Sequence, residues 1–153
     1  MLINRFNLSL LLSCTLVSTA SFAANDLLTA PISERIKASS EYASAGEGRV
    51  QAFDKNQNTK WLTFDYTGWL SYEFPYPAKI AQYTITSGND APLRDPKTWQ
   101  LEGSADGIFW TRLDSRSNET FTTRFQRKTY SFTNSTAYRF YRLNISENSG
   151  EGI

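Results

Sequence analysis

Beyond residue 30, apolar and polar residues alternate with a period of two along most of the chain. This period places one side of each run against a core, as in a half-buried β-strand. The apolar members of the three clearest runs are Leu70, Tyr72 and Phe74, then Trp99 and Leu101, then Tyr141, Leu143 and Ile145. Two further segments, 80–86 and 129–133, are rich in β-branched and aromatic residues and also predict strands. No segment has the pattern of a long amphipathic helix.

Turn-forming residues separate these predicted strands. Asp106-Gly107 lies between the segments 99–104 and 108–113, and this dipeptide favours the positive φ values of a hairpin turn. We expect Trp110, just beyond the turn, to lie in the core; the alternative is an exposed ligand-stacking indole. Several short strands at this spacing predict one all-β domain, an antiparallel sandwich.

The N-terminal segment 1–23 has the pattern of a secretory signal peptide. Arg5 precedes a short apolar run, and Ser21-Phe22-Ala23 is a small-residue cleavage site. A buried N-terminal helix and lipoprotein processing at Cys14 are the alternatives. The preferred interpretation predicts a secreted domain of residues 24–153, periplasmic or extracellular.

Composition excludes several classes of function. Without Arg5 the chain has 15 basic and 15 acidic residues, so no strong field attracts nucleic acid. The chain has no histidine, and its one cysteine lies in the predicted leader, which removes histidine-based triads and thiol chemistry. No second hydrophobic span follows the leader, so we expect no transmembrane segment. We therefore expect no enzymatic activity.

The segment 52–61 places many oxygen donors between two large aromatic residues, Phe53 and Trp61. The donors are Asp54, Asn56, Gln57, Asn58 and Thr59. Calcium takes six to eight oxygens from such groups and from backbone carbonyls. The loop therefore suggests a structural calcium site, and a polar turn without an ion is the alternative.

With these segments in order, the chain resembles the discoidin domain, or coagulation factor V/VIII type C domain, a group that includes family 32 carbohydrate-binding modules. The matching pieces are Ala-Phe-Asp…Asn-Thr-Lys-Trp at 52–61, Trp-Leu-Ser-Tyr-Glu-Phe at 69–74, the segments 83–90 and 94–107, Trp-Thr-Arg-Leu-Asp at 110–114, and Tyr-Arg-Phe-Tyr-Arg-Leu-Asn-Ile at 138–145. They cover about Ile36 to Gly150. The resemblance implies a galactose-binding-like jelly-roll sandwich with ligand loops at one end.

The resemblance also implies details of the calcium site and of the last strand. Asp54 and Thr59 would supply side-chain oxygens to calcium, with Asn56 as an additional ligand. In the family a last strand, with a glutamate that closes the calcium site, follows the segment matching 148–150. This chain ends at Ile153, so we expect that strand to be lacking, which predicts either a fragment or a strand-donating partner.

Sugar binding needs an aromatic platform and polar groups for the hydroxyls. The expected ligand residues are the aromatics Tyr42, Phe64, Tyr66 and Trp69 and the polar residues Asn89, Asp90 and Arg94. Each polar residue and Trp69 also has an alternative role. Trp69 would lie in the core, Asn89 and Asp90 would cap a turn, and Arg94 would form an ion pair with Asp95. The family's galactose binders often use a histidine, which is absent here, so galactose specificity does not carry over.

The sequence thus predicts a noncatalytic domain that binds a glycan or glycoconjugate. The alternatives are an adhesion module for protein or phospholipid, and a truncated fragment of a larger glycan-active enzyme.

Overall fold

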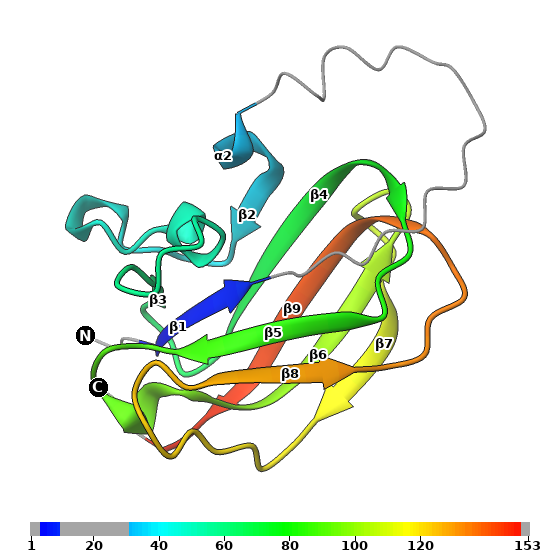
Figure 1. Cartoon of the computed structure of the whole chain (residues 1–153). Helices are drawn as coiled ribbons and strands as arrows, with labels where there is room; N and C mark the ends of the chain where they lie inside the picture. The colour runs from blue at the N-terminus through cyan, green and yellow to red at the C-terminus, as the bar shows by residue number, and fades with distance from the viewer. Residues whose placement is uncertain (1–3, 10–30, 151–153) are drawn as a thin grey trace.

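A computed structural model describes residues 4–9 and 31–150 of the chain. Figure 1 shows two antiparallel sheets packed face to face. The strands are β1 (Asn4–Ser9), β2 (Ile36–Ala38), β3 (Trp61–Thr63), β4 (Gly68–Ala78), β5 (Gln82–Ser87), β6 (Pro96–Ser104), β7 (Thr111–Arg116), β8 (Arg127–Ser131) and β9 (Tyr138–Asn148). One sheet has the order β3-β1-β5-β8 and the other β2-β4-β9-β6-β7. The predicted all-β sandwich is confirmed.

Helical elements are short throughout the described ranges. They are α2 (Ile32–Arg35), η1 (Ala43–Ala45), η2 (Arg49–Ala52) and η3 (Pro92–Arg94). No helix in these ranges is long and apolar enough to cross a membrane.

The core fills the space between the two sheets. Its largest fully buried side chains include Trp61, Trp99, Tyr83 and Tyr141. The Trp99 indole N–H donates to the Tyr83 hydroxyl at 2.8 Å, so the polar ends of these two rings satisfy each other. The apolar residues that alternate in the segments 70–74, 99–101 and 141–145 are the core-facing residues of β4, β6 and β9.

The hairpin at Asp106-Gly107 forms, but β7 begins later than predicted. Asp106 Oδ1 accepts hydrogen bonds from the backbone amides of Ile108 and Phe109, which holds both residues in the turn. Gly107 has a φ of 77°, in the left-handed region that favours glycine.

The expectation that Trp110 lies in the core is wrong. The indole is half-buried, and the Arg142 guanidinium lies 4.1 Å from its ring centroid. Trp69 is also half-buried and lies 5.9 Å from the same guanidinium. The three side chains therefore stack outside the core cluster, where cation–π attraction replaces burial.

Strand β1 belongs to the segment predicted as a signal peptide. It pairs with β3 on one side and with β5 on the other. Residues 10–30, with the predicted cleavage site, lie outside the described residues, as do 151–153. The leader stays a prediction.

Candidate functional site

Most of the long loops gather at one end of the sandwich, near the starts of β4 and β6 and the end of β5 (Figure 1). This loop end consists of the segments 39–60, 64–67, 88–95 and 117–126. Antiparallel order places them together, because each of these segments leaves or enters its sheet on the same side. The opposite end carries the shorter connections 79–81, 105–110 and 132–137.

Lys60 joins two of these segments, 39–60 and 88–95. Its side chain is only 7% exposed, and Nζ lies 3.2 Å from Glu47 Oε1 and 3.1 Å from Asp90 Oδ1. The same ammonium donates to Asn89 Oδ1. A buried ammonium requires such partners, because desolvation without compensation costs several kcal/mol, on the order of 5. Lys60 therefore fixes the positions of the 39–48 and 88–95 loops relative to its own.

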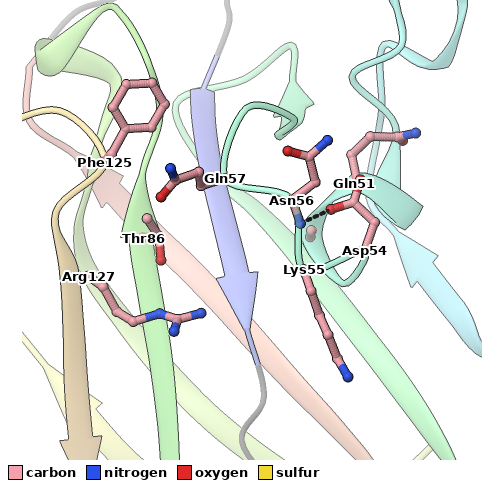
Figure 2. Close-up of a pocket in the computed structure, with 9 residues that line it drawn as sticks. Gln51, Asp54, Lys55, Asn56, Gln57, Thr86, Phe125 and Arg127 are labelled. Carbon is pink, nitrogen blue, oxygen red and sulfur yellow. Dashed lines mark hydrogen bonds between the residues drawn. The ribbon is translucent and has the colours of Figure 1, made fainter.

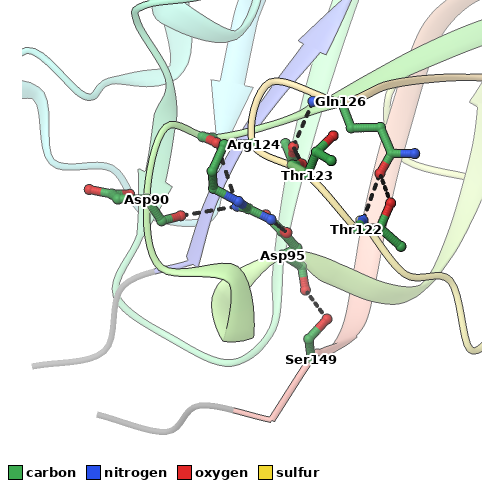
Figure 3. Close-up of polar contacts among 9 residues, drawn as sticks. Asp90, Asp95, Thr122, Thr123, Arg124, Gln126 and Ser149 are labelled. Atoms are coloured by element: carbon green, nitrogen blue, oxygen red, sulfur yellow. Dashed lines mark hydrogen bonds and ion pairs between the residues drawn. The ribbon is translucent and has the colours of Figure 1, made fainter.

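Asp95 and Arg124 form a second buried link (Figure 3). The Asp95 side chain is 1% exposed, and its two oxygens accept from the two terminal nitrogens of Arg124. Burial raises the pKa of Asp95 above its ordinary value, while the hydrogen bond and charge of Arg124 act in the opposite direction. Arg124 also donates to the Asp90 carbonyl at 3.1 Å, so loop 117–126 is held against loop 88–95.

Aromatic side chains lie on the surface of this framework. The Tyr42 and Phe64 rings pack with centroids 5.3 Å apart, and Tyr66 is 46% exposed. The Trp61 indole N–H donates to the Ser40 carbonyl at 2.9 Å, which anchors the segment before Tyr42 to the core. Tyr42, Phe64 and Tyr66 thus come from two loops at the same end of the molecule.

The other predicted ligand residues have different surroundings. Asn89 and Asp90 both bind Lys60, so the structure gives them a part in holding the loops. Arg94 is half-buried in η3. Trp69 stands on β4 with its ring beside the Arg142 guanidinium.

Arg94 was paired with Asp95 in the alternative interpretation of the sequence, but the partner of Asp95 is Arg124. Arg94 is the last residue of η3, and Asp95 follows it with an extended backbone.

The predicted calcium residues lie together in one loop. Asp54 Oδ2 accepts from Thr59 Oγ1 at 2.6 Å, and Asp54 Oδ1 accepts from the Asn56 amide at 2.8 Å. The Thr59 hydroxyl also lies 2.8 Å from the Asn56 carbonyl. Asp54 is the one carboxylate among these three side chains, and the described residues contain no cluster of three or more histidine, cysteine or acidic side chains. The donor set suits a hard cation chemically, but its charge is low.

A cavity of about 260 Å³ lies beside this loop (Figure 2). Gln51, Asp54, Lys55, Asn56 and Gln57 line one side, and Thr86, Phe125 and Arg127 line the other. Phe125 is exposed and has a φ of 59°, which turns the chain back toward β8. None of the residues expected to bind sugar lines this cavity.

Sequence analysis missed the residues that hold the loop end together, namely Glu47, Lys60 and Arg124. The structural role of Lys60 could have been predicted from its position, since this lysine lies directly before the buried strand that begins at Trp61. The role of Arg124 could not have been predicted, because this arginine lies in a polar segment whose composition is typical of a solvent-exposed loop.

Comparison with known proteins identifies the family. The family model of the F5/8 type C domain matches residues 35–153. The peptide-N(4)-(N-acetyl-beta-glucosaminyl)asparagine amidase of Arabidopsis thaliana is 38% identical over 105 residues, which are 63% of this chain and 15% of that protein. The chain therefore spans a small part of that relative's length.

Solved structures share the fold. CpGH89CBM32-5 from Clostridium perfringens, in complex with GalNAc-β-1,3-galactose, superposes with a TM-score of 0.65 at 22% identity, covering 76% of this chain and 86% of that one. The family 32 module of C. perfringens NanJ, in complex with galactose, gives 0.60 at 20% identity, covering 78% and 88%. At these identities the likeness establishes the sandwich fold. Together with the match over residues 35–153, it shows that the chain belongs to the F5/8 type C domain family.

Proposed function

We propose that this domain is a noncatalytic carbohydrate-binding module that holds a glycan at its loop end. The observation that carries the proposal is the group of Tyr42, Phe64 and Tyr66, three aromatic rings on loops that are fixed by buried polar contacts. Aromatic rings bind the apolar face of a pyranose, and a rigid site loses little entropy on binding.

The buried ion pairs explain why the loops are suited to this role. Lys60 ties loops 39–48 and 88–95 to the core strand β3, and Arg124 ties loop 117–126 to Asp95. Loops held in this way present their exposed side chains in one arrangement, so the ligand does not have to order them. Arg94, at the margin of the same end, is the cation that we assign to hydrogen bonding with sugar hydroxyls.

The relatives support a glycan as the ligand. Two of the solved structures named above carry galactose or a galactose-containing disaccharide, and a third, the family 32 module of AlyQ, is in complex with 4,5-unsaturated mannuronic acid. The Arabidopsis relative is an amidase named for N-acetylglucosaminyl asparagine, and this chain corresponds to 15% of it. We therefore assign the domain the task of bringing the protein that contains it, a larger glycan-active enzyme or a secreted protein, to its glycan.

Tyr66 and Tyr76 provide a matched pair for testing the location of the site. Both side chains are 46% exposed, but Tyr66 lies at the loop end and Tyr76 near the other end of β4. On glycan arrays and in calorimetric titration with the best array ligand, we expect Tyr66→Ala to weaken binding about tenfold, or about 1.4 kcal/mol. Tyr76→Ala should bind as the wild type does. Equal losses in both variants, or binding to anionic liposomes and to no glycan, would contradict the proposal.

We also propose that the 54–59 loop binds calcium weakly. Asp54, Asn56 and Thr59 would provide side-chain oxygens, and the ion would stabilise the loop without taking part in chemistry. With one carboxylate, we expect a dissociation constant in the range of about 0.1–1 mM that is found for extracellular modules.

Calcium at 10 mM should therefore raise the melting temperature by several degrees, since ligand at about ten to a hundred times its dissociation constant adds about 1.4–2.7 kcal/mol. Asp54→Asn should abolish this shift, while Asp65→Asn, a change of another exposed carboxylate in the next loop, should retain it. Magnesium, which prefers rigid octahedral sites, should have little effect. An unchanged melting temperature of the wild type in 10 mM calcium would refute the site.

A further inference from the structure

The cavity beside the 51–57 loop lies on the outer face of the sheet β3-β1-β5-β8. In β5 the side chains of Tyr83 and Ile85 pack in the core, so Thr86 points to the opposite face. Arg127 of β8 is the cross-strand partner of Thr86, and directly paired residues in an antiparallel ladder share one face. Both residues line the cavity, which therefore rests on two neighbouring strands.

The hydroxyl of Thr86 is buried without a partner. The residue is only 6% exposed, and its side chain makes no hydrogen bond within the described part of the chain. A polar group that leaves water without gaining a hydrogen bond costs free energy, so such groups are rare in native structures. Because Thr86 lines the cavity, a polar molecule bound there would supply the missing partner. This hydroxyl therefore points to a ligand site.

Two cations line the same cavity without an internal counter-charge. Lys55 and Arg127 are exposed, and neither side chain forms an ion pair or a hydrogen bond with the residues that the structure describes. Asp54 also lines the cavity, but its carboxylate accepts hydrogen bonds from Thr59 and from the Asn56 amide. Two positive charges and one negative charge give these lining residues a net charge of +1. A singly charged anion matches this balance better than a phosphate group, whose charge is about −1.5 to −2.

The remaining lining groups suit the uncharged part of a sugar. Phe125 is 39% exposed, and an exposed ring packs against the apolar face of a pyranose. The side-chain amide of Gln57 makes no hydrogen bond within the described residues. The side-chain oxygen of Asn56 accepts from the Asn58 amide, which leaves the nitrogen of the same side chain available as a donor. These amides match sugar hydroxyls in the way that a few convergent polar groups orient a ligand.

Backbone strain occurs on both sides of the cavity. Lys55 has a φ of 62° and Phe125 a φ of 59°, in the left-handed region that residues other than glycine rarely adopt. Figure 2 shows the two residues on opposite sides of the cavity, with the Arg127 side chain extended toward the 51–57 loop. Strained residues of this kind concentrate at ligand clamps and active sites, where the surrounding structure holds them.

We propose that this cavity is a second binding site, which takes a single pyranose unit carrying a carboxylate, as in a uronic acid. Arg127 binds the carboxylate, Thr86 hydrogen-bonds to the ligand at the floor, and Phe125 packs against the sugar ring. The volume of about 260 Å³ lies just below the range of about 300–1,000 Å³ for drug-sized ligands, so it suits one sugar unit. The three aromatic residues of the proposed glycan site do not line this cavity, so the proposal does not depend on that site.

The first test compares an acid with its uncharged amide. The full chain, labelled with nitrogen-15, is titrated with D-glucuronate or D-glucuronamide at pH 7 in EDTA, which keeps calcium out of the result. We expect glucuronate to shift the amide signals of residues 51–57, 86 and 125–127, with a dissociation constant on the order of 1 mM. Glucuronamide should bind about tenfold more weakly, because it lacks the charge that the guanidinium recognises.

Arg127→Gln tests the assigned cation, and Arg112→Gln is its matched control. Arg112 is an exposed arginine on β7 of the other sheet, and it too has no ion-pair partner among the described residues. We expect Arg127→Gln to bind glucuronate about tenfold more weakly and to lose the preference for the acid over the amide. Arg112→Gln should bind both ligands as the wild type does.

Thr86→Val separates a ligand contact from a structural role. The hydroxyl has no partner within the described chain, so its removal should leave the melting temperature equal to or above that of the wild type. The same variant should bind glucuronate about tenfold more weakly, because the ligand loses a hydrogen bond. A lower melting temperature with unchanged affinity would show that Thr86 supports the sheet and does not contact a ligand.

The proposal is overturned if glucuronate at about 20 mM leaves the signals of residues 51–57 and 125–127 unchanged. It is also overturned if the amide binds as tightly as the acid, or if the shifts occur only in residues 39–48 and 64–67. Inorganic phosphate that binds the cavity as tightly as glucuronate would show an anion site without sugar recognition, which likewise contradicts the proposal. Failure of neutral glycans to bind the loop aromatics leaves all these readouts unchanged, so the two proposals fail separately.

Discussion

Replacing Arg124 by methionine is expected to lower the free energy of unfolding by about 3–5 kcal/mol at pH 7. The substitution leaves the Asp95 carboxylate, only 1% exposed, without the guanidinium that neutralises it. A buried charge that loses its partner keeps its full desolvation cost. The link between loops 88–95 and 117–126 through Asp90 and Gly88 carbonyls is lost as well.

The pH dependence of this loss separates an electrostatic cause from simple loss of packing. Burial raises the pKa of Asp95 in the folded state, so the folded state binds this proton more tightly than the unfolded state. The contribution of Asp95 to the free energy of unfolding therefore falls as pH rises from the pKa of the unfolded state, about 3.9, through the higher pKa of the folded state. Removing Arg124 raises the folded pKa further, so the variant should recover part of its lost stability at pH 4.5.

Urea denaturation at pH 7 and pH 4.5 measures both effects. Lys97→Met is the matched control, because it breaks an exposed ion pair with Glu147 and should cost less than about 1 kcal/mol. A loss for Arg124→Met that is as small as the control's, or that is the same at both pH values, would contradict a buried charge pair at Asp95.

Replacing Trp61 by alanine is expected to cost a similar amount, about 3–5 kcal/mol. The indole is 0% exposed, and its removal leaves a large cavity between β3 and the opposite sheet. It also removes the donor to the Ser40 carbonyl, which holds the segment before Tyr42. The measurement is the urea midpoint with its slope, since an unchanged slope assigns the difference to stability.

Trp61→Phe separates the cavity from the hydrogen bond. Phenylalanine keeps most of the ring but has no N–H, so the Ser40 carbonyl loses its indole donor at a cost of about 1–3 kcal/mol. Because that carbonyl anchors the loop of Tyr42, this variant should also bind glycan more weakly than the wild type at a temperature where both are folded. Full glycan affinity in Trp61→Phe would show that the anchor does not position the binding loop.

Local alternation was sufficient to predict three strands of the second sheet, β4, β6 and β9. In β4, β6 and β9 the alternating apolar residues pack against the core, so the hydrophobic pattern predicts which face of each strand is buried. Trp110 was misplaced because the side chain of Asp106 holds the next residues in a turn and because Arg142 offers the indole an alternative partner. Neither effect appears in a pattern of hydrophobicity.

The loop end could be predicted only in part. Tyr42, Phe64 and Tyr66 lie in loops as the sequence predicts, because aromatic residues in polar segments between strands are easily recognised, and their contact with sugar stays a prediction. The contacts of Lys60 with Asp90 and of Arg124 with Asp95 join residues about thirty positions apart, and single charges carry no sign of their partner. The segment Asn4–Ser9 is ambiguous for another reason. Its apolar residues Phe6 and Leu8 alternate with polar ones as in a strand, and the same segment leads into the apolar run of the predicted leader.

The most direct test of the central claim is to map a glycan ligand on the protein by NMR. Amide signals of the full chain would be assigned and followed while the best ligand from the glycan array is added. The account predicts that the shifts concentrate in residues 39–48, 64–67 and 88–95, with the glycan recovered chemically unchanged. Shifts confined to the opposite end, at residues 105–110 and 132–137, or cleavage of the glycan by the purified protein, would contradict it.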